Sequence, residues 1–141
     1  EDQNSFKLNG STAVLAGKPD IILLQPAVKR ATVIDEKSGK VKDQYIWQVL
    51  LYMFALKLTG LKEWLIDGEV EYKNDFIVPV KSAQLNNTNT KRIGEVLQLI
   101  GNPQEPPRTP SQWECEYCDV LECPDRFQKP PVQVADASSH F

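Results

Sequence analysis

The feature that most constrains this chain is a pair of aspartates at the ends of two neighbouring apolar strands. Residues 20–24 read DIILL and residues 30–35 read RATVID, and apolar, β-branched stretches of this kind predict buried strands. Only residues 25–29 separate the two stretches, so we expect an antiparallel hairpin. Asp20 and Asp35 would then lie side by side near one edge of a sheet.

Two carboxylates held this close need a positive charge between them. A divalent cation meets that need, and Asp20, Asp35 and the backbone carbonyl of Glu36 offer the oxygen ligands that Mg²⁺ or Mn²⁺ prefers. Lys37 shares a strand face with Asp35, whereas the Glu36 side chain points to the opposite face. An ammonium there helps to orient an attacking water and offsets charge in a phosphoryl transition state. The alternative is a pair of strand-end turn residues beside a solvated lysine, because an Asp-x-Lys tripeptide is weak evidence by itself.

Residues 42–58 predict a helix that carries a second set of polar side chains. Residues 49–56 are apolar almost all round, so we expect this helix to be buried. Gln44, Gln48 and Tyr52 recur every four residues and therefore share one helical face. Buried Gln and Tyr side chains need hydrogen-bond partners. Those partners are either helix ends and backbone groups at the sheet edge, or a substrate phosphate and the strand-end carboxylates.

These elements together resemble the PD-(D/E)XK nuclease superfamily, and more narrowly its RecB-type and CRISPR-associated exonuclease branch. The matching motifs are Gly17-x-x-Asp20, Asp35-x-Lys37-Ser38-Gly39 and Gln48-x-x-x-Tyr52. The resemblance implies that the two acids and the intervening carbonyl bind metal, that the lysine assists the attacking water, and that Gln48 and Tyr52 position the substrate. It also implies that a helix with a Glu or His precedes the first strand. Residues 1–9 do not supply one, so we expect an N-terminal portion outside this sequence.

The remaining patterns predict two more hairpins and one more helix. The expected strands are residues 5–8, 12–16, 63–72 and 76–80, with turns at residues 9–11 and 73–75. Residues 90–100 predict an amphipathic helix that ends at Gly101. We therefore expect an α/β (α+β) fold with a restriction-endonuclease-like core, in which helices flank a central mixed β-sheet.

The overall charge weighs against tight unaided binding to DNA. The 141 residues carry a formal net charge of −3, whereas nucleic-acid-binding domains usually present strongly basic patches. A bound cation would cancel part of the negative charge. We also expect five basic residues to cluster around the metal site, namely Lys29, Arg30, Lys37, Lys40 and Lys42. No stretch predicts a membrane span or a signal peptide, so we expect a cytoplasmic protein without a membrane partner.

All three cysteines fall within one short segment, at Cys115, Cys118 and Cys123. A Cys-x-x-Cys pair followed by a third cysteine and Pro124 is typical of a [4Fe–4S] or Zn²⁺ site, although free buried thiols are an open alternative. A disulfide is less expected in a cytoplasmic protein. The resemblance implies a structural cluster whose fourth cysteine lies upstream of the nuclease core. This sequence has none there, and the identity of the fourth ligand stays open, with His140 as one candidate.

The chain is therefore expected to contain four segments. These are a nuclease core at residues 1–101, a proline-rich linker at 102–112, a cysteine segment that packs on the core at 113–130, and a disordered tail at 131–141. The expected activity is that of a Mg²⁺- or Mn²⁺-dependent deoxyribonuclease, by resemblance an exonuclease, acting on single-stranded DNA or duplex ends. The alternative is a nuclease-like module that no longer cuts and serves DNA binding or assembly. Partners among other DNA-processing proteins, the pathway (CRISPR adaptation, recombination DNA repair or phage replication) and the oligomeric state stay open.

Overall fold

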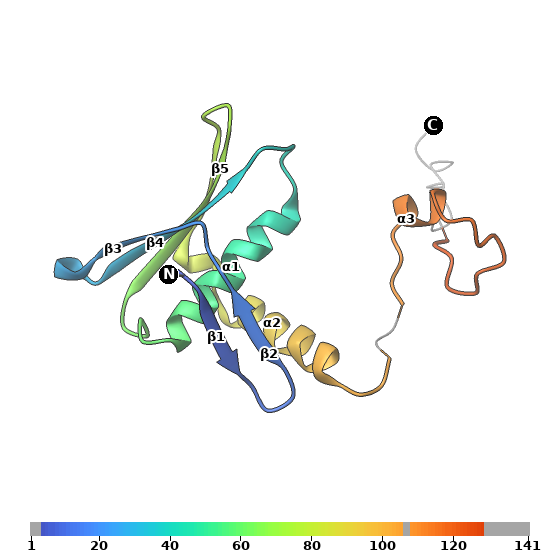
Figure 1. Cartoon of the computed structure of the whole chain (residues 1–141), viewed down its shortest axis with the longest axis horizontal. Coiled ribbons are helices and arrows are strands. Elements are labelled where there is room, and N and C mark those ends of the chain that lie inside the picture. Colours follow the sequence, from blue (N-terminus) through green and yellow to red (C-terminus); the bar gives the residue numbers. More distant parts are fainter. Residues whose placement is uncertain (1–3, 106–107, 129–141) are drawn as a thin grey trace, which may run out of the picture. The chain divides into compact units, whose positions relative to one another are not determined.

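A four-stranded mixed sheet in the order β3-β4-β5-β6 forms the centre of the fold (Figure 1). The computed structural model describes residues 4–105 and 108–128, and the chain divides into two compact units, residues 1–103 and 104–141. The sheet belongs to the first unit. Its strands are β3 (Ile21–Gln25), β4 (Arg30–Lys37), β5 (Leu65–Tyr72) and β6 (Ile77–Val80).

The connections between these strands determine their directions. A short 3₁₀ turn, η1 (Pro26–Val28), joins β3 to β4, and the two strands pair antiparallel as the sequence predicted. β4 and β5 pair in parallel, which requires a crossover, and α1 (Asp43–Leu58) supplies it. A tight turn then returns the chain as β6, antiparallel to β5. The result is the mixed sheet flanked by helices that we expected for a restriction-endonuclease-like core.

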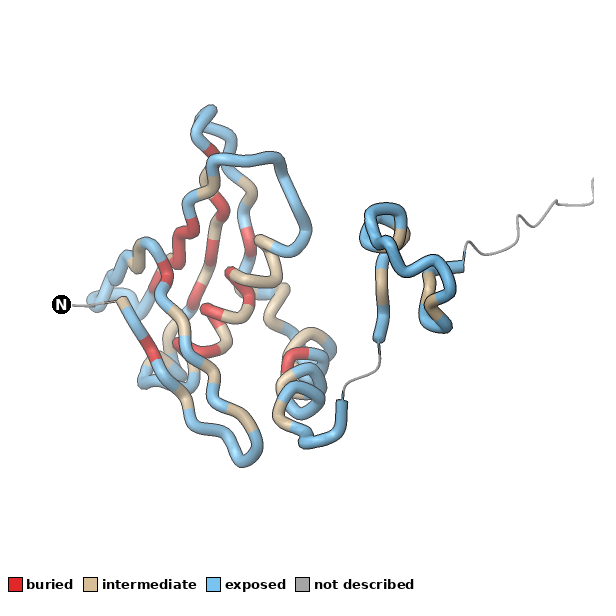
Figure 2. The backbone as a smooth tube through the Cα atoms, turned by 45° about the vertical axis from the view of Figure 1, so that its right-hand side comes forward, coloured by how far each residue is buried: buried red, intermediate tan, exposed pale blue. Residues whose placement is uncertain are grey.

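The core lies between the sheet and α1. Figure 2 shows that the buried residues gather in the strands and in the facing helix. Val49 and Met53 on α1 are completely buried, and so are Val33 on β4 and Val70 on β5. Gly68 on β5 lies directly under the helix, where a Cβ atom would overlap Val49 Cγ1 and come within 3.1 Å of Met53 Sδ. The absence of a side chain at this position therefore permits the close approach of α1 to the sheet.

A two-stranded hairpin and a second long helix complete the first unit. β1 (Phe6–Asn9) pairs antiparallel with β2 (Val14–Gly17), and a 3₁₀ turn, η2 (Ser82–Gln84), precedes α2 (Asn87–Gly101). This helix begins three residues before the predicted start at residue 90. The N-cap explains this earlier start. The Asn86 side chain accepts a 2.9 Å hydrogen bond from the Asn89 N–H, which stabilises the first turn of the helix.

The second unit contains one short helix, α3 (Gln112–Glu116), which the sequence analysis did not predict. Its signal is present as a capping box, in which Ser111 and Glu114 satisfy each other's backbone N–H groups. The Arg126 guanidinium donates hydrogen bonds to the carbonyl oxygens of Cys115 and Val120, which holds the following loop against the helix. The predicted disordered tail, residues 131–141, lies outside the described residues. Among the described residues, no helix is long and apolar enough to cross a membrane.

Replacing Gly68 with alanine is expected to destabilise the first unit. The added Cβ overlaps the γ-methyl group of Val49, which is a stiff β-branched side chain, so the helix has to move away from the sheet. We expect urea denaturation to show a loss of about 1–3 kcal/mol in the free energy of unfolding. Gly39→Ala is the matched control, since a Cβ at Gly39 meets nothing within 4 Å. Equal stability of the two variants would contradict the proposed packing.

Candidate active site

The structure brings the two predicted aspartates together at one end of the β3–β4 hairpin. Ile21 lies opposite Ile34, and this register places Asp20 beside Asp35. The Glu36 backbone N–H donates a 2.8 Å hydrogen bond to Asp20 Oδ2. Asp35 is only 2 % exposed, although Asp20 is open to solvent. One carboxylate is therefore buried and the other lies at the mouth of the site.

Lys37 forms an ion pair with the buried aspartate. Its Nζ lies 2.7 Å from Asp35 Oδ2. Partial burial by itself lowers the pKa of Lys37, but the contact with Asp35 and the negative charges of Asp35 and Asp20 outweigh this effect. The pKa is therefore raised above its ordinary value, and the ammonium form is favoured.

The donor set at this end of the hairpin fits a divalent cation. Asp35 Oδ2 is buried, and the Lys37 ammonium 2.7 Å away is its charge partner. Two neighbouring carboxylates beside one ammonium leave negative charge that a metal ion would neutralise. Within residues 4–105 and 108–128, no group of three or more His, Cys, Asp or Glu side chains could hold a metal. The site thus offers two carboxylates, and the Glu36 carbonyl and water would complete a Mg²⁺ or Mn²⁺ shell.

α1 places the predicted glutamine and tyrosine together on its inner side. Gln48 Nε2 donates a 2.9 Å hydrogen bond to the Tyr52 hydroxyl, so these two side chains are partners of each other. Tyr52 is 9 % exposed and meets the Phe6 ring edge-on at 5.9 Å between ring centroids. Gly17 permits this packing, because a Cβ there would lie 2.7 Å from Phe6 Cζ and 2.9 Å from Tyr52 Cε1. Gln44, which shares their helical spacing, is exposed.

The structure adds an aromatic residue that the sequence analysis missed. Lys37 Nζ lies 4.9 Å from the centroid of the Tyr45 ring, within the range of a cation–π interaction. Tyr45 precedes Gln48 by three residues and Tyr52 by seven, so helical spacing alone could have found it. The lysine is thus held between a carboxylate and an aromatic ring.

The predicted cluster of five basic residues is wrong in part. Lys29 and Arg30 lie at the start of β4, whereas Lys37 is its last residue. Eight residues of strand separate the two ends by roughly 23 Å. Arg30 instead forms a 3.3 Å ion pair with Asp67. Lys40 and Lys42 lie in the segment that leads from the Lys37 end of β4 to α1.

A family model described as the PD-(D/E)XK nuclease superfamily matches residues 2–123. The chain belongs to this superfamily. The matched range covers most of the chain and includes the aspartate pair and Lys37. Membership indicates a nuclease, a hydrolase whose substrate is a nucleic acid, and these nucleases typically use divalent metals such as Mg²⁺. No curated protein and no solved structure gives a significant match to the chain.

The cysteine segment of this nuclease-superfamily chain is arranged differently from the prediction. Cys115 lies on α3 rather than in a short metal-binding turn, and Cys118 and Cys123 follow in loops. All three thiols are free and line one hollow of about 370 Å³. The Phe127 N–H donates a 3.2 Å hydrogen bond to Cys115 Sγ. In the described residues the thiols do not form a group that could hold a metal, so this geometry does not support the predicted iron–sulfur or zinc site.

Divalent metal is expected to stabilise the protein through Asp35. A ligand that binds only the folded state at 100 times its Kd adds about 2.7 kcal/mol of stability. We expect Mn²⁺ to raise the Tm of the wild type in a thermal-unfolding experiment and to leave the Tm of Asp35→Asn unchanged. Glu36→Gln is the matched control, because its exposed side chain lies on the opposite strand face and its carbonyl is retained. An equal metal-induced rise in Asp35→Asn would refute a metal site at this carboxylate.

Proposed function

We propose that this chain is a Mg²⁺- or Mn²⁺-dependent deoxyribonuclease, and within the superfamily an exonuclease of the RecB-type and CRISPR-associated branch. The observation that carries the proposal is the pair of neighbouring carboxylates, Asp20 and the buried Asp35, with the Lys37 ammonium 2.7 Å from Asp35 Oδ2. Two adjacent carboxylates carry more negative charge than one lysine balances, and a divalent cation would supply the rest. Asp20, Asp35 and the Glu36 carbonyl are the proposed ligands.

Each residue of the site has a defined part in this proposal. A bound divalent cation supplies Lewis-acid polarisation of the scissile phosphate and lowers the pKa of water. Lys37, held between Asp35 and the Tyr45 ring, presents a positive charge to the phosphate and stabilises negative charge in the transition state. The Gln48–Tyr52 pair presents an amide and a hydroxyl on the inner side of α1, where they position the substrate.

DNA ends are the proposed substrate, in keeping with the branch that the three motifs resemble. Asp20 is exposed, so a phosphodiester can reach the mouth of the site directly from solvent. The net charge of −3 means that the metal ion and a few local contacts, rather than a broad basic face, have to attract the strand.

Cleavage of end-labelled DNA tests the proposal. We expect single- or double-stranded DNA to be degraded in Mg²⁺ or Mn²⁺ and to stay intact in EDTA. Lys37→Ala is expected to lower kcat by about 10²- to 10³-fold, which is typical for loss of one transition-state contact. Lys91→Ala is the matched control, since this exposed lysine pairs only with Glu95 on α2 among the contacts described. Circular dichroism verifies that both variants fold.

The outcome separates the nuclease from a module that only binds DNA. Metal-dependent degradation that Lys37→Ala abolishes supports the nuclease. DNA binding without degradation in either metal supports the non-cleaving module. Degradation that Lys37→Ala leaves unchanged would falsify the assignment of this residue.

We further propose that Cys115, Cys118 and Cys123 bind a [4Fe–4S] cluster or Zn²⁺ after a local rearrangement. Two observations support this reading. The three thiols already line one hollow, and the N–H···S hydrogen bond from Phe127 is of the kind that stabilises a thiolate ligand. The rearrangement is required because the thiols do not converge in the described structure.

Metal analysis of protein purified without oxygen tests the cysteine proposal. A brown protein with a broad visible absorption band indicates iron–sulfur, and a colourless protein with one bound zinc indicates Zn²⁺. Cys118→Ala is expected to lose the metal in either case, since three cysteines are the minimum protein ligand set. Metal-free protein would show that these are ordinary thiols.

Four predictions from the sequence stay part of the proposal. They are the nuclease core at residues 1–101 followed by a linker, the packing of the cysteine segment on that core, a cytoplasmic location, and partners among other DNA-processing proteins.

A further inference from the structure

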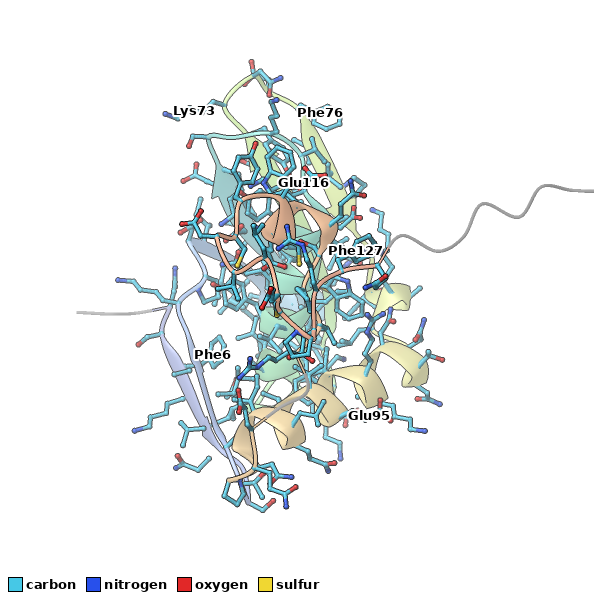
Figure 3. All side chains as sticks on the ribbon, turned by 90° about the vertical axis from the view of Figure 1, so that its right-hand side faces the viewer. Phe6, Lys73, Phe76, Glu95, Glu116 and Phe127 are labelled. Carbon is cyan, nitrogen blue, oxygen red and sulfur yellow. The ribbon has the colours of Figure 1, made fainter. Side chains whose placement is uncertain are left out.

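The turn between β5 and β6 is a rigid projection beside the candidate active site. The Asp75 N–H donates a 3.0 Å hydrogen bond to the Tyr72 carbonyl, and the Tyr72 N–H donates a 2.9 Å bond to the Phe76 carbonyl. Asp75 has a φ of 59°, a left-handed conformation that Asp tolerates better than most residues. These features define a three-residue hairpin turn of a common type. The turn therefore holds its side chains in a defined direction, and Figure 3 shows Lys73 and Phe76 projecting from its tip.

The register of the sheet connects this tip to Lys37. Lys37 on β4 lies opposite Tyr72 on β5, and the hairpin places Phe76 opposite Tyr72. Residues directly opposite one another point to the same face of a sheet. The three side chains therefore form one row on the α1 face. Two strand spacings separate Lys37 from Phe76, which amounts to roughly 10 Å between their Cα atoms.

Phe76 is the exposed member of this row. Tyr72 is 7 % exposed and buries the middle of the row, with its ring centroid 6.0 Å from that of Phe76. Phe76 itself is 50 % exposed. Tyr72 thus supports one side of the Phe76 ring and leaves the rest open to a ligand.

A hollow of about 430 Å³ adjoins both Lys37 and the tip. Its lining residues come from both faces of the sheet, at the ends of β4 and β5. They are Glu36, Lys37, Ser38, Glu71, Tyr72, Lys73 and Asp75. Its two lysines attract phosphates, and its three carboxylates repel them. A nucleic-acid strand that leaves the metal site is therefore expected to pass along the rim, past Lys73 and Phe76.

We propose that Phe76 is a stacking platform for an unpaired base of the DNA strand held at the Asp20–Asp35 site, and that Lys73 contacts a phosphate of the same strand. The proposal rests on the function proposed above. Aromatic rings bind single-stranded DNA by stacking on bases, whereas the bases of an intact duplex are already stacked. The roughly 10 Å from Lys37 to Phe76 amounts to at most about three base steps, counted at the 3.4 Å rise of a duplex strand. The tip thus selects single-stranded or frayed ends.

Binding to a single-stranded oligonucleotide in Ca²⁺ is the first test. Ca²⁺ takes oxygen ligands but is not one of the ions proposed for cleavage. Phe76→Ala is expected to raise Kd by about 5- to 150-fold, the usual range for loss of one stacked base. Phe76→Trp is expected to retain affinity. Ile77→Ala is the matched control, because Ile77 is 48 % exposed and is paired with Glu71, on the opposite face of the sheet. Lys73→Ala is expected to lower the slope of log K against log salt by about 0.7.

A fluorescent base analogue locates the contact. With 2-aminopurine moved one position at a time along the oligonucleotide, we expect quenching at one position in the wild type and in Phe76→Trp, and none there in Phe76→Ala. Equal affinity and equal quenching in the wild type and Phe76→Ala would overturn the inference. An equal loss of affinity in Ile77→Ala would also overturn it, since the effect would then belong to the hairpin as a whole.

A short substrate separates this inference from the proposed function. Bis(p-nitrophenyl) phosphate lacks the nucleotides that the proposed strand places between the metal site and Phe76, so the wild type and Phe76→Ala are expected to hydrolyse it equally in Mn²⁺. If neither hydrolyses it and neither degrades DNA, the nuclease proposal fails while the binding experiments still decide the role of Phe76. If the wild type does not bind single-stranded DNA, the stacking inference fails even where the ester is hydrolysed.

Discussion

The charge of Asp35 is the constraint on which the rest of this domain depends. A carboxylate that is 2 % exposed, at the end of a central strand, is strongly disfavoured unless positive charge comes close to it. Lys37 provides part of that charge at 2.7 Å, and the Glu36 N–H holds the neighbouring Asp20 in place. The single charge of Lys37 does not balance both carboxylates. The proposed divalent cation would supply the rest, in agreement with the metal dependence typical of the PD-(D/E)XK nuclease superfamily.

The same helix that makes the sheet possible also forms the wall of the site. Parallel pairing of β4 with β5 requires a crossover, and α1 fills that need while it carries Tyr45, Gln48 and Tyr52. Two glycines allow the helix its position, because Gly68 lets its backbone approach the sheet and Gly17 makes room for the Tyr52 ring. Packing and chemistry are therefore coupled, and a shift of α1 would move the groups around Lys37.

Because the chain is acidic overall, its binding of a nucleic acid has to depend on a few local contacts. With a net charge of −3, this nuclease-superfamily member lacks the excess of basic residues that often attracts nucleic acid. Two of the five lysines and arginines expected around the site lie at the far end of β4. A bound cation, Lys37 and an aromatic contact at Phe76 are the features that remain to hold a strand. The proposed contacts would favour a flexible, unpaired strand, whose bases are free to stack.

The sequence by itself determined the strands, the long helix and the superfamily, because apolar periodicity and three ordered motifs are local properties of the chain. It also placed Asp20 beside Asp35, since a short connection between two strands leaves little choice but a hairpin. Only the tertiary structure decided that Asp35 is buried, that Gln48 and Tyr52 bond to each other, and that Phe76 lies in one row with Lys37. The burial of Asp35 and the alignment of Phe76 with Lys37 depend on the parallel register between β4 and β5. A whole helix separates these two strands in the sequence. The cysteine spacing shows the same limit, because it predicted a metal-binding turn where the capping box of Ser111 and Glu114 forms a helix instead.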